Sequence, residues 1–172
     1  MLEGLLLLTF AAAPLPTQDW VDLARYAGRW YEIARLPNRF QAHCAGDVAA
    51  TYTLRADGRV RVVNECRRDD GEITRAEGVA RRAHDTGPSS RLKVRFAPRI
   101  LSFLPFVWGD YWILELDRDY RHAVVGDPGR KYLWILSRSP AMDAATYHGL
   151  AAAAGGLGFD TTRLVRTEHS GC

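Results

Sequence analysis

Residues 48–66 read VAATYTLRADGRVRVVNEC, in which two alternating runs are separated by Asp-Gly at positions 57–58. Asp-Gly is among the strongest short signals for a β-hairpin, because a tight turn needs residues that tolerate positive φ. In RVRVVNEC the two arginines fall on one face and the first two valines fall on the other. The stretch therefore predicts antiparallel strands at 48–55 and 59–66, each with a polar outer face and an apolar inner face.

The same pattern recurs along most of the chain. Short segments with strand-like alternation follow one another at intervals of about eight to twelve residues, and turn residues separate them. This spacing is typical of an all-β sandwich or barrel, here built from sequential hairpins. Together with the opening hairpin, these segments make eight expected strands. The further segments are residues 29–36, 73–82, 91–96, 111–117, 121–126 and 131–138.

One predicted wall has small side chains on its inner face. In residues 73–82, Ala76, Gly78 and Ala80 share the face opposite to the charged side chains. A sandwich core would fill this space with larger residues such as Leu or Ile, because protein interiors are close-packed. The small residues therefore leave room on the inside of the sheet and favour a hollow interior.

Two of the expected strands are apolar on both faces. Residues 111–116 (YWILEL) and 132–136 (YLWIL) carry apolar side chains at nearly every position, so another element is expected to cover their outer faces. Ser139-Pro140 has the residues of a helix N-cap and first turn, and the Ala-rich segment after it ends at Gly155-Gly156. We therefore expect one C-terminal α-helix that packs against the outside of the last strand.

Size and composition indicate one globular domain. The chain has 172 residues, of which 47% are hydrophobic and 25% are charged, and these are ordinary values for a folded domain. The net charge of +3 is small, the arginines are spread over many segments, and no nucleic-acid-binding motif occurs. We therefore expect no nucleic-acid partner. We also expect the protein to be a monomer or a weak homodimer.

Residues 1–18 are interpreted as a signal or N-terminal segment, and residues 19–172 as the folded domain. An apolar run at 5–10 precedes Ala11-Ala12-Ala13, which offers an A-x-A cleavage site for secretion, although Glu3 replaces the usual positive start. The run is too short to span a bilayer. We expect export to the periplasm or to an outer-membrane-associated location, and the segment contains no cysteine for lipidation.

Three short motifs resemble those of the lipocalin family. Gly28-Arg29-Trp30 looks like the G-x-W that opens the lipocalin fold, and Asp117 and Tyr120 stand in the place of the second motif. Arg138 stands in the place of the third motif. The longer stretches GRWYEIARLPNRF, ATYTLRADG, LDRDYRHAVV and YLWILSRSP resemble bacterial lipocalins and their animal relative apolipoprotein D. The resemblance covers nearly the whole chain.

This resemblance implies the fold class. Lipocalins are all-β proteins with an eight-stranded antiparallel up-and-down β-barrel and one C-terminal α-helix packed outside, and such a barrel encloses space for one small ligand. In the family, the tryptophan of the first motif plugs the closed end, and the arginine of the last strand lies across its ring. Trp30 and Arg138 are therefore expected to be structural, with a stacking energy of ~0.5–2 kcal/mol. Gly28, Asp117 and Tyr120 are expected to be structural as well.

The segment at 100–112, ILSFLPFVWGDYW, is very apolar for a loop. Counting hairpins from the first strand places it at the open end of the barrel, and exposed apolar clusters tend to mark binding sites. We expect Phe103, Phe106 and Trp108 to contact an apolar ligand at the mouth; the alternative is that the loop packs on itself as ordinary core. Loop 100–109 is also a candidate for contact with a membrane surface.

The resemblance also implies the ligand class and most of the pocket. Related lipocalins carry fatty acids, lysophospholipids or other small lipophilic molecules, and bacterial relatives are thought to serve cell-envelope maintenance or stress response. We expect the same kind of ligand here and no cofactor. The expected contacts are mostly aromatic with a few polar groups, as in many small-molecule sites. They are Tyr52, Asn64, Trp112, Trp134 and Leu136 from the resemblance, and Phe96 from side-chain alternation.

The three cysteines are typical of an oxidising compartment, with one disulfide and one cysteine left over. Their spacing fits no zinc motif, so no metal site is expected. Cys66 is expected to face inward, with Cys44 in a loop at the same open end, and Cys44–Cys66 is the pair that we favour. The alternative pair is Cys44–Cys172, which the apolipoprotein D pattern implies.

A free thiol at Cys66 defines the alternative function, which is a cavity-thiol enzyme acting on a lipid, as in an isomerase-like lipocalin. A reactive cysteine needs an activating neighbour, and no base is visibly aimed at Cys66. The sequence also has no G-x-S-x-G motif, no paired carboxylates on one inner wall and no phosphate-binding loop. We therefore expect a binding protein without catalytic residues, and not an enzyme.

Overall fold

The structure is a computed structural model, and it describes residues 14–96 and 107–171. Within this part of the chain nine strands form one sheet, accompanied by a short helix at the N-terminal side and a longer one near the C-terminus. The strands are β1 (Gly28–Arg35), β2 (Gly46–Leu54), β3 (Val60–Arg67), β4 (Ile73–Arg82), β5 (Arg91–Arg95), β6 (Gly109–Leu116), β7 (His122–Gly126), β8 (Leu133–Ser137) and β9 (Val165–Arg166).

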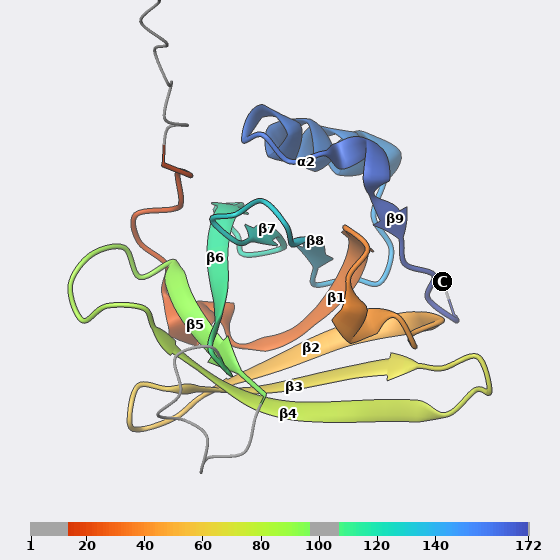
Figure 1. The fold of residues 1–172 in the computed structure, drawn as a ribbon, viewed down its shortest axis with the longest axis horizontal. Coiled ribbons are helices and arrows are strands. Elements are labelled where there is room, and N and C mark those ends of the chain that lie inside the picture. Colours follow the sequence, from red (N-terminus) through yellow and green to blue (C-terminus); the bar gives the residue numbers. More distant parts are fainter. Residues whose placement is uncertain (1–13, 97–106, 172) are drawn as a thin grey trace, which may run out of the picture.

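The strands are joined into a closed barrel. Each strand from β1 to β7 pairs antiparallel with the next one in sequence. β1 also pairs with β8, which closes the sheet, and β9 adds to β1 on the other side of its C-terminal part (Figure 1). The predicted up-and-down β-barrel is confirmed, and the expected segments coincide with the observed strands apart from small differences at their ends.

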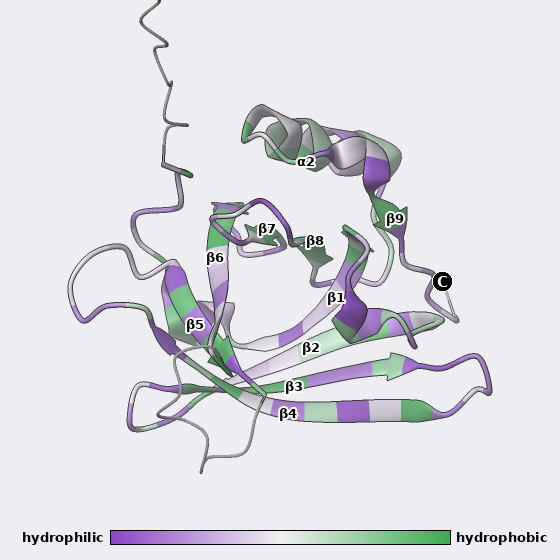
Figure 2. Ribbon diagram, in the orientation of Figure 1, coloured by the Kyte–Doolittle hydropathy of each residue, from purple (hydrophilic) through white to green (hydrophobic). Residues whose placement is uncertain are grey.

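Side-chain alternation places the charged residues of β3 outside and its apolar residues inside. Val60, Val62 and Cys66 are buried, whereas Arg61 is exposed and pairs with Glu77 on β4. The alternation is visible as changing colours along β3 and β4 in Figure 2. The inner and outer faces predicted for this hairpin are therefore confirmed.

Gly78 on β4 is required by the close approach of β5. A Cβ at this position would lie 2.6 Å from the carbonyl oxygen of Arg95 and 2.7 Å from the Phe96 ring. The space that the sequence analysis expected at Gly78 is therefore taken by Phe96. Ala76 and Ala80, the other small residues of this wall, do line the interior.

Helix α2 (Ala144–Gly156) covers the outside of the barrel beside β7 and β8 (Figure 1). Leu114, Val124 and Leu133 point out of the barrel and pack with Ala154 of this helix and with Phe159. This cluster explains why the strands at 111–116 and 132–136 are apolar on both faces. The predicted external helix is confirmed.

The N-cap of α2 differs from the sequence expectation. The capping residue is Asp143, whose Oδ1 accepts the backbone N–H of Thr146 at 2.9 Å and whose Oδ2 accepts the Thr146 hydroxyl at 2.7 Å. Ser139 instead accepts the backbone N–H of Ala141 in the turn before the helix. The helix therefore begins at Ala144, after the Asp143 cap, and later than the cap at Ser139 would place it.

Residues 14–18, which the sequence analysis assigned to the N-terminal segment, pack on the barrel. Leu15 is buried in the outer apolar cluster, and the backbone N–H of Gln18 donates to the carbonyl oxygen of Ile113 at 3.2 Å. The proposed cleavage site at 11–13 lies outside the described residues. Among the residues that the structure describes, no helix is both long and apolar enough to cross a membrane.

Asp47 fixes the C-terminal tail to the open end of β2. Its carboxylate accepts the backbone N–H of Ser170 at 2.6 Å and pairs with Arg67 at 2.7 Å. Partial burial opposes ionisation of this carboxyl group, but the hydrogen bonds from Ser170 and Arg67 outweigh that cost and lower the pKa of Asp47 to about 2. The tail therefore lies beside the mouth of the barrel as a bound segment.

The closed end of the barrel is built around Trp30. Its side chain is fully buried, and its indole N–H donates to the carbonyl oxygen of Tyr26, in helix α1 (Leu23–Tyr26), at 2.8 Å. The Arg138 guanidinium lies 4.1 Å from the centre of the indole ring. The structural roles predicted for Trp30 and Arg138 agree with this geometry. The guanidinium also donates hydrogen bonds to the backbone carbonyls of Arg25, Tyr26, Arg29 and Tyr120.

Gly28, Asp117 and Tyr120 complete this end. Gly28 has a φ of 101°, and a Cβ there would lie 3.0 Å from the guanidinium above the indole. Asp117 caps the turn between β6 and β7, where its Oδ1 accepts the backbone N–H of His122 at 2.6 Å. The Tyr120 hydroxyl accepts the backbone N–H of Asp22 at 3.0 Å and so joins this turn to the N-cap of α1.

Arg138→Ala is expected to lower the free energy of unfolding by about 2–4 kcal/mol, because it removes the stacked cation and leaves carbonyl oxygens at the closed end without donors. Chemical denaturation followed by tryptophan fluorescence measures the change. Arg118→Ala is the matched control, because Arg118 is exposed on the neighbouring turn, and it should change stability by less than about 0.5 kcal/mol. Equal effects of the two substitutions would contradict the closing role of Arg138.

Candidate ligand-binding site

A cavity of about 810 Å³ occupies the inside of the barrel. This size is typical of small-molecule sites. The cavity opens where the β1–β2, β5–β6 and β7–β8 connections meet, and these connections contribute Phe40, Val107 and Tyr132 to its lining. The open end therefore lies where hairpin counting predicted it.

The wall of the cavity is mainly apolar. β2 to β6 and β8 contribute its side chains, most of them aliphatic or aromatic. Replacing water on such a surface by apolar ligand atoms is favourable, because apolar area is removed from solvent. The aliphatic part of the wall consists of Val48, Val60, Val62, Ala80, Leu92 and Val94, with further residues around them.

Most of the predicted contacts line this cavity. Phe103 and Phe106 lie outside the described residues, so their contact with a ligand stays a prediction. The predicted residues that the structure brings together around the cavity are Tyr52, Asn64, Phe96, Trp108, Trp134 and Leu136.

The prediction that Trp112 lies inside the barrel is wrong. Trp112 packs against the outer apolar cluster, and the Arg91 guanidinium lies 4.5 Å from the centre of its ring. Its neighbour Tyr111 lines the cavity instead. Across the β5–β6 ladder Arg91 pairs with Trp112 and Leu92 pairs with Tyr111. Residues that oppose each other in a ladder share a face, so the outward Arg91 places Trp112 outside.

Three tyrosine hydroxyls meet at the closed end of the cavity. Tyr26 belongs to α1, Tyr52 to β2 and Tyr111 to β6. The Tyr111 hydroxyl lies 2.8 Å from that of Tyr26 and 2.9 Å from that of Tyr52. Burial raises the pKa of Tyr52 to about 12, and it raises the pKa values of Tyr26 and Tyr111 well above their ordinary value. The floor of the cavity is therefore a neutral group of hydroxyls.

Sequence reasoning missed two members of this group for different reasons. Tyr26 lies before the first strand, in a segment without strand alternation, so no periodic signal pointed to the cavity. Tyr111 lies in a strand that is apolar on both faces, so alternation alone could not orient it. The register with β5 is the signal that would have found Tyr111.

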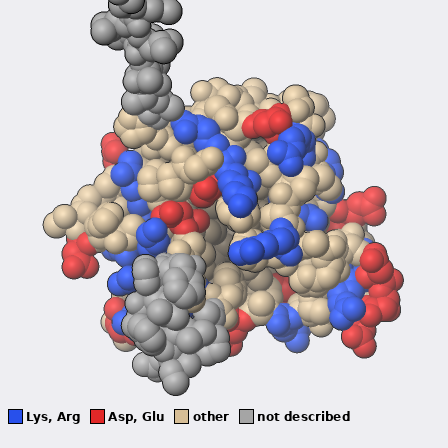
Figure 3. All heavy atoms as spheres, in the orientation of Figure 1, with Lys and Arg blue, Asp and Glu red and all other residues tan. Residues whose placement is uncertain are grey.

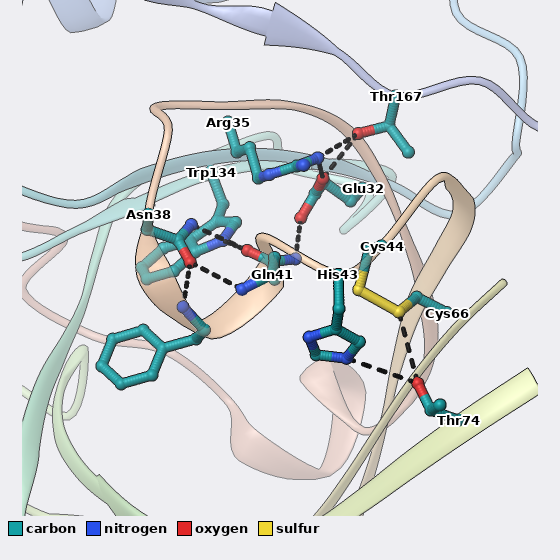
Figure 4. The surroundings of a disulfide bond; sticks show 11 residues. Glu32, Arg35, Asn38, Gln41, His43, Cys44, Cys66, Thr74, Trp134 and Thr167 are labelled. Carbon is teal, nitrogen blue, oxygen red and sulfur yellow. Dashed lines mark hydrogen bonds and ion pairs between the residues drawn. A yellow bond between two sulfur atoms is a disulfide. The ribbon is translucent and has the colours of Figure 1, made fainter. Parts of the chain in front are cut away.

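A hydrogen-bond network holds the β1–β2 loop at the mouth (Figure 4). Gln41 accepts the indole N–H of Trp134 at 2.8 Å and donates to the buried Glu32 at 2.5 Å. Glu32 also pairs with Arg35 at 2.7 Å and accepts the Thr167 hydroxyl at 2.5 Å. The network therefore fixes the ring of Trp134 and connects this part of the cavity wall to the C-terminal tail.

Aromatic side chains continue from Trp134 to the rim. The ring of Tyr132 stacks on Trp134, with 6.0 Å between the ring centres and 11° between the planes. Phe40 follows at 5.6 Å from Tyr132 and is 56% exposed. These three rings form an apolar path from solvent into the cavity.

Charges of both signs surround the mouth. Arg39, His43 and Arg75 line the cavity, and Arg75 pairs with Glu65 at 3.2 Å. Arg39 lies near the Phe40 ring and pairs with no carboxylate in the part of the chain that the structure describes. Figure 3 shows basic and acidic residues interspersed on the face that it presents. Arg39 is thus a cation at the mouth that is available to an anionic head group.

Cys44 and Cys66 form a disulfide at the mouth, with their sulfur atoms 2.01 Å apart (Figure 4). The favoured pair is confirmed, and Cys172 lies outside the described residues. His43 approaches the disulfide, and its Nε2 lies 3.5 Å from the Thr74 hydroxyl. The potential ligand atoms of His43, Cys44 and Cys66 lie within 4.8 Å of one another, but the two sulfurs bond to each other and so offer no thiolate to a metal.

The same disulfide removes the thiol that the alternative function needs. A cysteine acts as a nucleophile through its thiolate, and the Cys66 sulfur is bonded to Cys44. The geometry therefore does not support a cavity-thiol enzyme that acts through Cys66. The expectation that the protein has no catalytic residues stays a prediction.

A closed antiparallel barrel with an apolar cavity, a wide mouth at one end and an Arg–Trp stack at the other defines a ligand-binding β-barrel. A family model described as a lipocalin-like domain matches residues 21–169. The chain therefore belongs to the lipocalin family, whose members bind small hydrophobic ligands.

Named relatives agree with this assignment. The chain is 44% identical over 151 residues to "Temperature-induced lipocalin-1" of Arabidopsis thaliana, with 87% of this chain and 80% of the relative covered. It is 41% identical over 153 residues to "Outer membrane lipoprotein Blc" of Escherichia coli K12, with the same coverage. It is 30% identical over 165 residues to "Apolipoprotein D" of Cavia porcellus, with 91% and 82% covered. The resemblance to bacterial lipocalins and apolipoprotein D is confirmed.

Solved structures support the fold independently of close sequence similarity. Insecticyanin from Manduca sexta superposes with a TM-score of 0.70 at 21% identity, covering 94% of this chain and 87% of that one. Apocrustacyanin C1 gives a TM-score of 0.68 at 22% identity, covering 88% and 82%. At these identities the likeness shows the fold alone.

Replacing Cys44 and Cys66 together by alanine is expected to lower the free energy of unfolding by about 3 kcal/mol, because the bond closes a loop with a sequence separation of 22. Urea denaturation measures this loss, and peptide mapping without reductant identifies the linked peptides. Cys172→Ala is the control and should leave both the cross-link and the stability unchanged. A cross-linked peptide that contains Cys172 in place of Cys66 would refute the assigned pair.

Proposed function

We propose that this protein carries single-chain lipophilic molecules, such as fatty acids or lysophospholipids, in its barrel cavity and serves cell-envelope maintenance or stress response. The observation that carries the proposal is the apolar cavity of about 810 Å³ with Arg39 at its mouth, which pairs with no carboxylate among the residues that the structure describes. The hydrocarbon chain occupies the barrel, and the charged head group stays at the open end.

Burial of the hydrocarbon chain provides the affinity. Each methylene that leaves water contributes about 0.8 kcal/mol, so a fourteen-carbon chain gives roughly 10 kcal/mol before the costs of binding. The loss of translational, rotational and chain freedom removes several of these kcal/mol. A dissociation constant in the micromolar range, equivalent to about −8 kcal/mol, is the expected result.

The head group has a cationic partner at the rim. The Arg39 guanidinium is exposed and lies next to Phe40, on the path into the cavity. A guanidinium binds carboxylate and phosphate through charge-assisted hydrogen bonds, which are stronger than neutral ones. When Arg39 holds the carboxylate or phosphate, the hydrocarbon chain of the ligand can enter the cavity between Phe40 and Trp134.

The cellular role in this proposal takes support from the names of relatives. The bacterial relative at 41% identity is named an outer membrane lipoprotein, and the plant relative at 44% identity is named for its induction by temperature. An exported protein in the periplasm or at the outer membrane is consistent with the disulfide and with the name of the bacterial relative.

The proposal includes contact between the mouth and a membrane surface, from which a lipid would enter. Phe40, Ile73 and Phe96 are large apolar side chains near the open end, and they are 56%, 51% and 42% exposed. Arg39 adds a positive charge beside them, and cationic side chains are attracted to anionic lipid surfaces. Loop 100–109, of which residues 107–109 are described, extends this surface in the prediction from the sequence.

Addition of a fourteen-carbon fatty acid is expected to quench tryptophan fluorescence with a micromolar dissociation constant, because Trp108 and Trp134 line the cavity. Trp134→Phe should remove much of the quenching, whereas Trp112→Phe should not, because Trp112 lies on the outer surface of the barrel. Native mass spectrometry of the protein expressed in bacteria should show co-purified lipid. The absence of both quenching and bound lipid would rule out the proposed carrier function.

Sedimentation with vesicles of anionic phospholipid tests the membrane contact. Replacing Phe40 and Ile73 together by serine is expected to lower the bound fraction several-fold, because two apolar side chains no longer enter the interface. Trp20→Ser is the matched control, since Trp20 is 72% exposed but belongs to the N-terminal segment beside the closed end. Equal losses for both variants would show that the mouth is not the contact surface.

A further inference from the structure

The floor of the cavity has one more hydrogen-bond donor than its own contacts use. Tyr26, Tyr52 and Tyr111 carry three hydroxyl groups, and each hydroxyl supplies one hydrogen. Their oxygens form two hydrogen bonds, Tyr26–Tyr111 and Tyr52–Tyr111, which use two of the three hydrogens. Within the described part of the chain these hydroxyls have no further partner. One hydrogen is therefore left over, whichever way the chain of hydrogen bonds runs.

The leftover hydrogen belongs to a group that is shielded from bulk water. Tyr26 is 2% exposed and Tyr52 is 7% exposed, and all three tyrosines line the cavity. The Tyr26 ring lies 4.9 Å from the ring of Trp30, which places the cluster at the closed end. A buried donor without an acceptor costs about 1–3 kcal/mol, so the floor favours an occupant that supplies an acceptor.

We propose that this hydroxyl cluster binds a neutral oxygen acceptor on the leading end of the ligand. The inference rests on the proposed carrier function. It narrows the proposed ligands to single-chain lipophilic molecules that bear a ketone, aldehyde, ester or ether oxygen at the end far from the mouth. The acceptor takes the free hydroxyl hydrogen, and the rest of the chain lies along the apolar wall.

The acceptor is neutral because the floor is a poor place for an anion. The burial that raises the pKa values of Tyr26, Tyr52 and Tyr111 would equally disfavour a carboxylate. The Arg138 guanidinium stacks on Trp30, and its N–H groups already donate to backbone carbonyls. An anionic head group therefore stays at the mouth, and the uncharged oxygen enters first.

The distance from floor to mouth suits such a two-ended ligand. Val60 lies at the closed end of β3 and Cys66 at the open end, and both line the cavity. Six residue steps along a strand span ~20 Å. A lipid-sized chain can therefore reach the tyrosines while its head group remains at Arg39.

The test compares two probes in wild-type protein and in the Tyr26→Phe, Tyr52→Phe, Tyr111→Phe triple variant. The probes are tetradecanoic acid and the same acid with a ketone oxygen on its penultimate carbon. The triple variant removes all three hydroxyl groups together. Because phenylalanine has nearly the same shape as tyrosine, no hydrogen-bond donor is left without an acceptor. Tyr147→Phe, on the outer helix, is the matched control. Dissociation constants are measured by tryptophan fluorescence.

The quantity compared is the dissociation constant of the ketone probe divided by that of tetradecanoic acid. This ratio is expected to be roughly tenfold larger in the triple variant than in wild-type protein, because the buried ketone oxygen has lost its donor. Tyr147→Phe should leave the ratio of the two dissociation constants unchanged. If that ratio is the same in the triple variant and in wild-type protein, the inference is overturned, while binding of the plain acid still upholds the carrier function. If neither probe binds wild-type protein, the carrier function fails and the inference falls with it.

A second measurement needs no variant and keeps the inference testable if the triple variant does not fold. The infrared stretch of the ketone carbonyl is recorded for the ketone probe bound to wild-type protein. A hydrogen-bonded ketone absorbs at a lower frequency than the same ketone in an alkane solvent. A shift to lower frequency supports the inference, and a stretch at the alkane position overturns it.

Discussion

The Arg138–Trp30 stack is the constraint on which the architecture depends. Closing the sheet through the β1–β8 pair makes a tube, and a tube holds a ligand only if one of its ends is shut. Arg138 shuts that end by covering the indole of Trp30 and by binding carbonyl oxygens from α1, β1 and the β6–β7 turn. One side chain thus ties the N-terminal segment of α1 and β1 to the β6–β7 turn, and the opposite end is left open.

The hydrogen-bonded polar groups described above lie at the two ends of the cavity. At the mouth, Gln41 and Glu32 form the network that orients Trp134, and Arg39 has no carboxylate partner within residues 14–96 and 107–171. At the floor, the tyrosine hydroxyls supply a neutral donor. Between them the wall is largely aliphatic and aromatic. This distribution gives an elongated lipophile a preferred direction, because each end of the ligand meets a different kind of partner.

Alternation predicted the strands, and it oriented those with one charged face. Val60, Val62 and Phe96 were placed correctly because arginine or lysine occupies the alternate positions around them. Trp112 was placed inside the barrel by the resemblance to lipocalins. Alternation could not correct this placement, because the strand of Trp112 is apolar on both faces where the outer cluster under α2 covers one of them. The helix start was misplaced at Ser139 because serine and aspartate are about equally good N-caps, and the two candidates, Ser139 and Asp143, stand close together in the sequence.

The sequence by itself determined the strands and the order of their hairpins, because both follow from local periodicity and turn residues. The end that opens was predicted from the resemblance to lipocalins. Only the tertiary structure decided which face of β6 looks inward, how Tyr26 joins Tyr52 and Tyr111, and how large a cavity remains. These features depend on the register between strands and on segments that meet across the barrel. Tyr26 and Tyr111, for example, are 85 positions apart, and no local pattern encodes their contact.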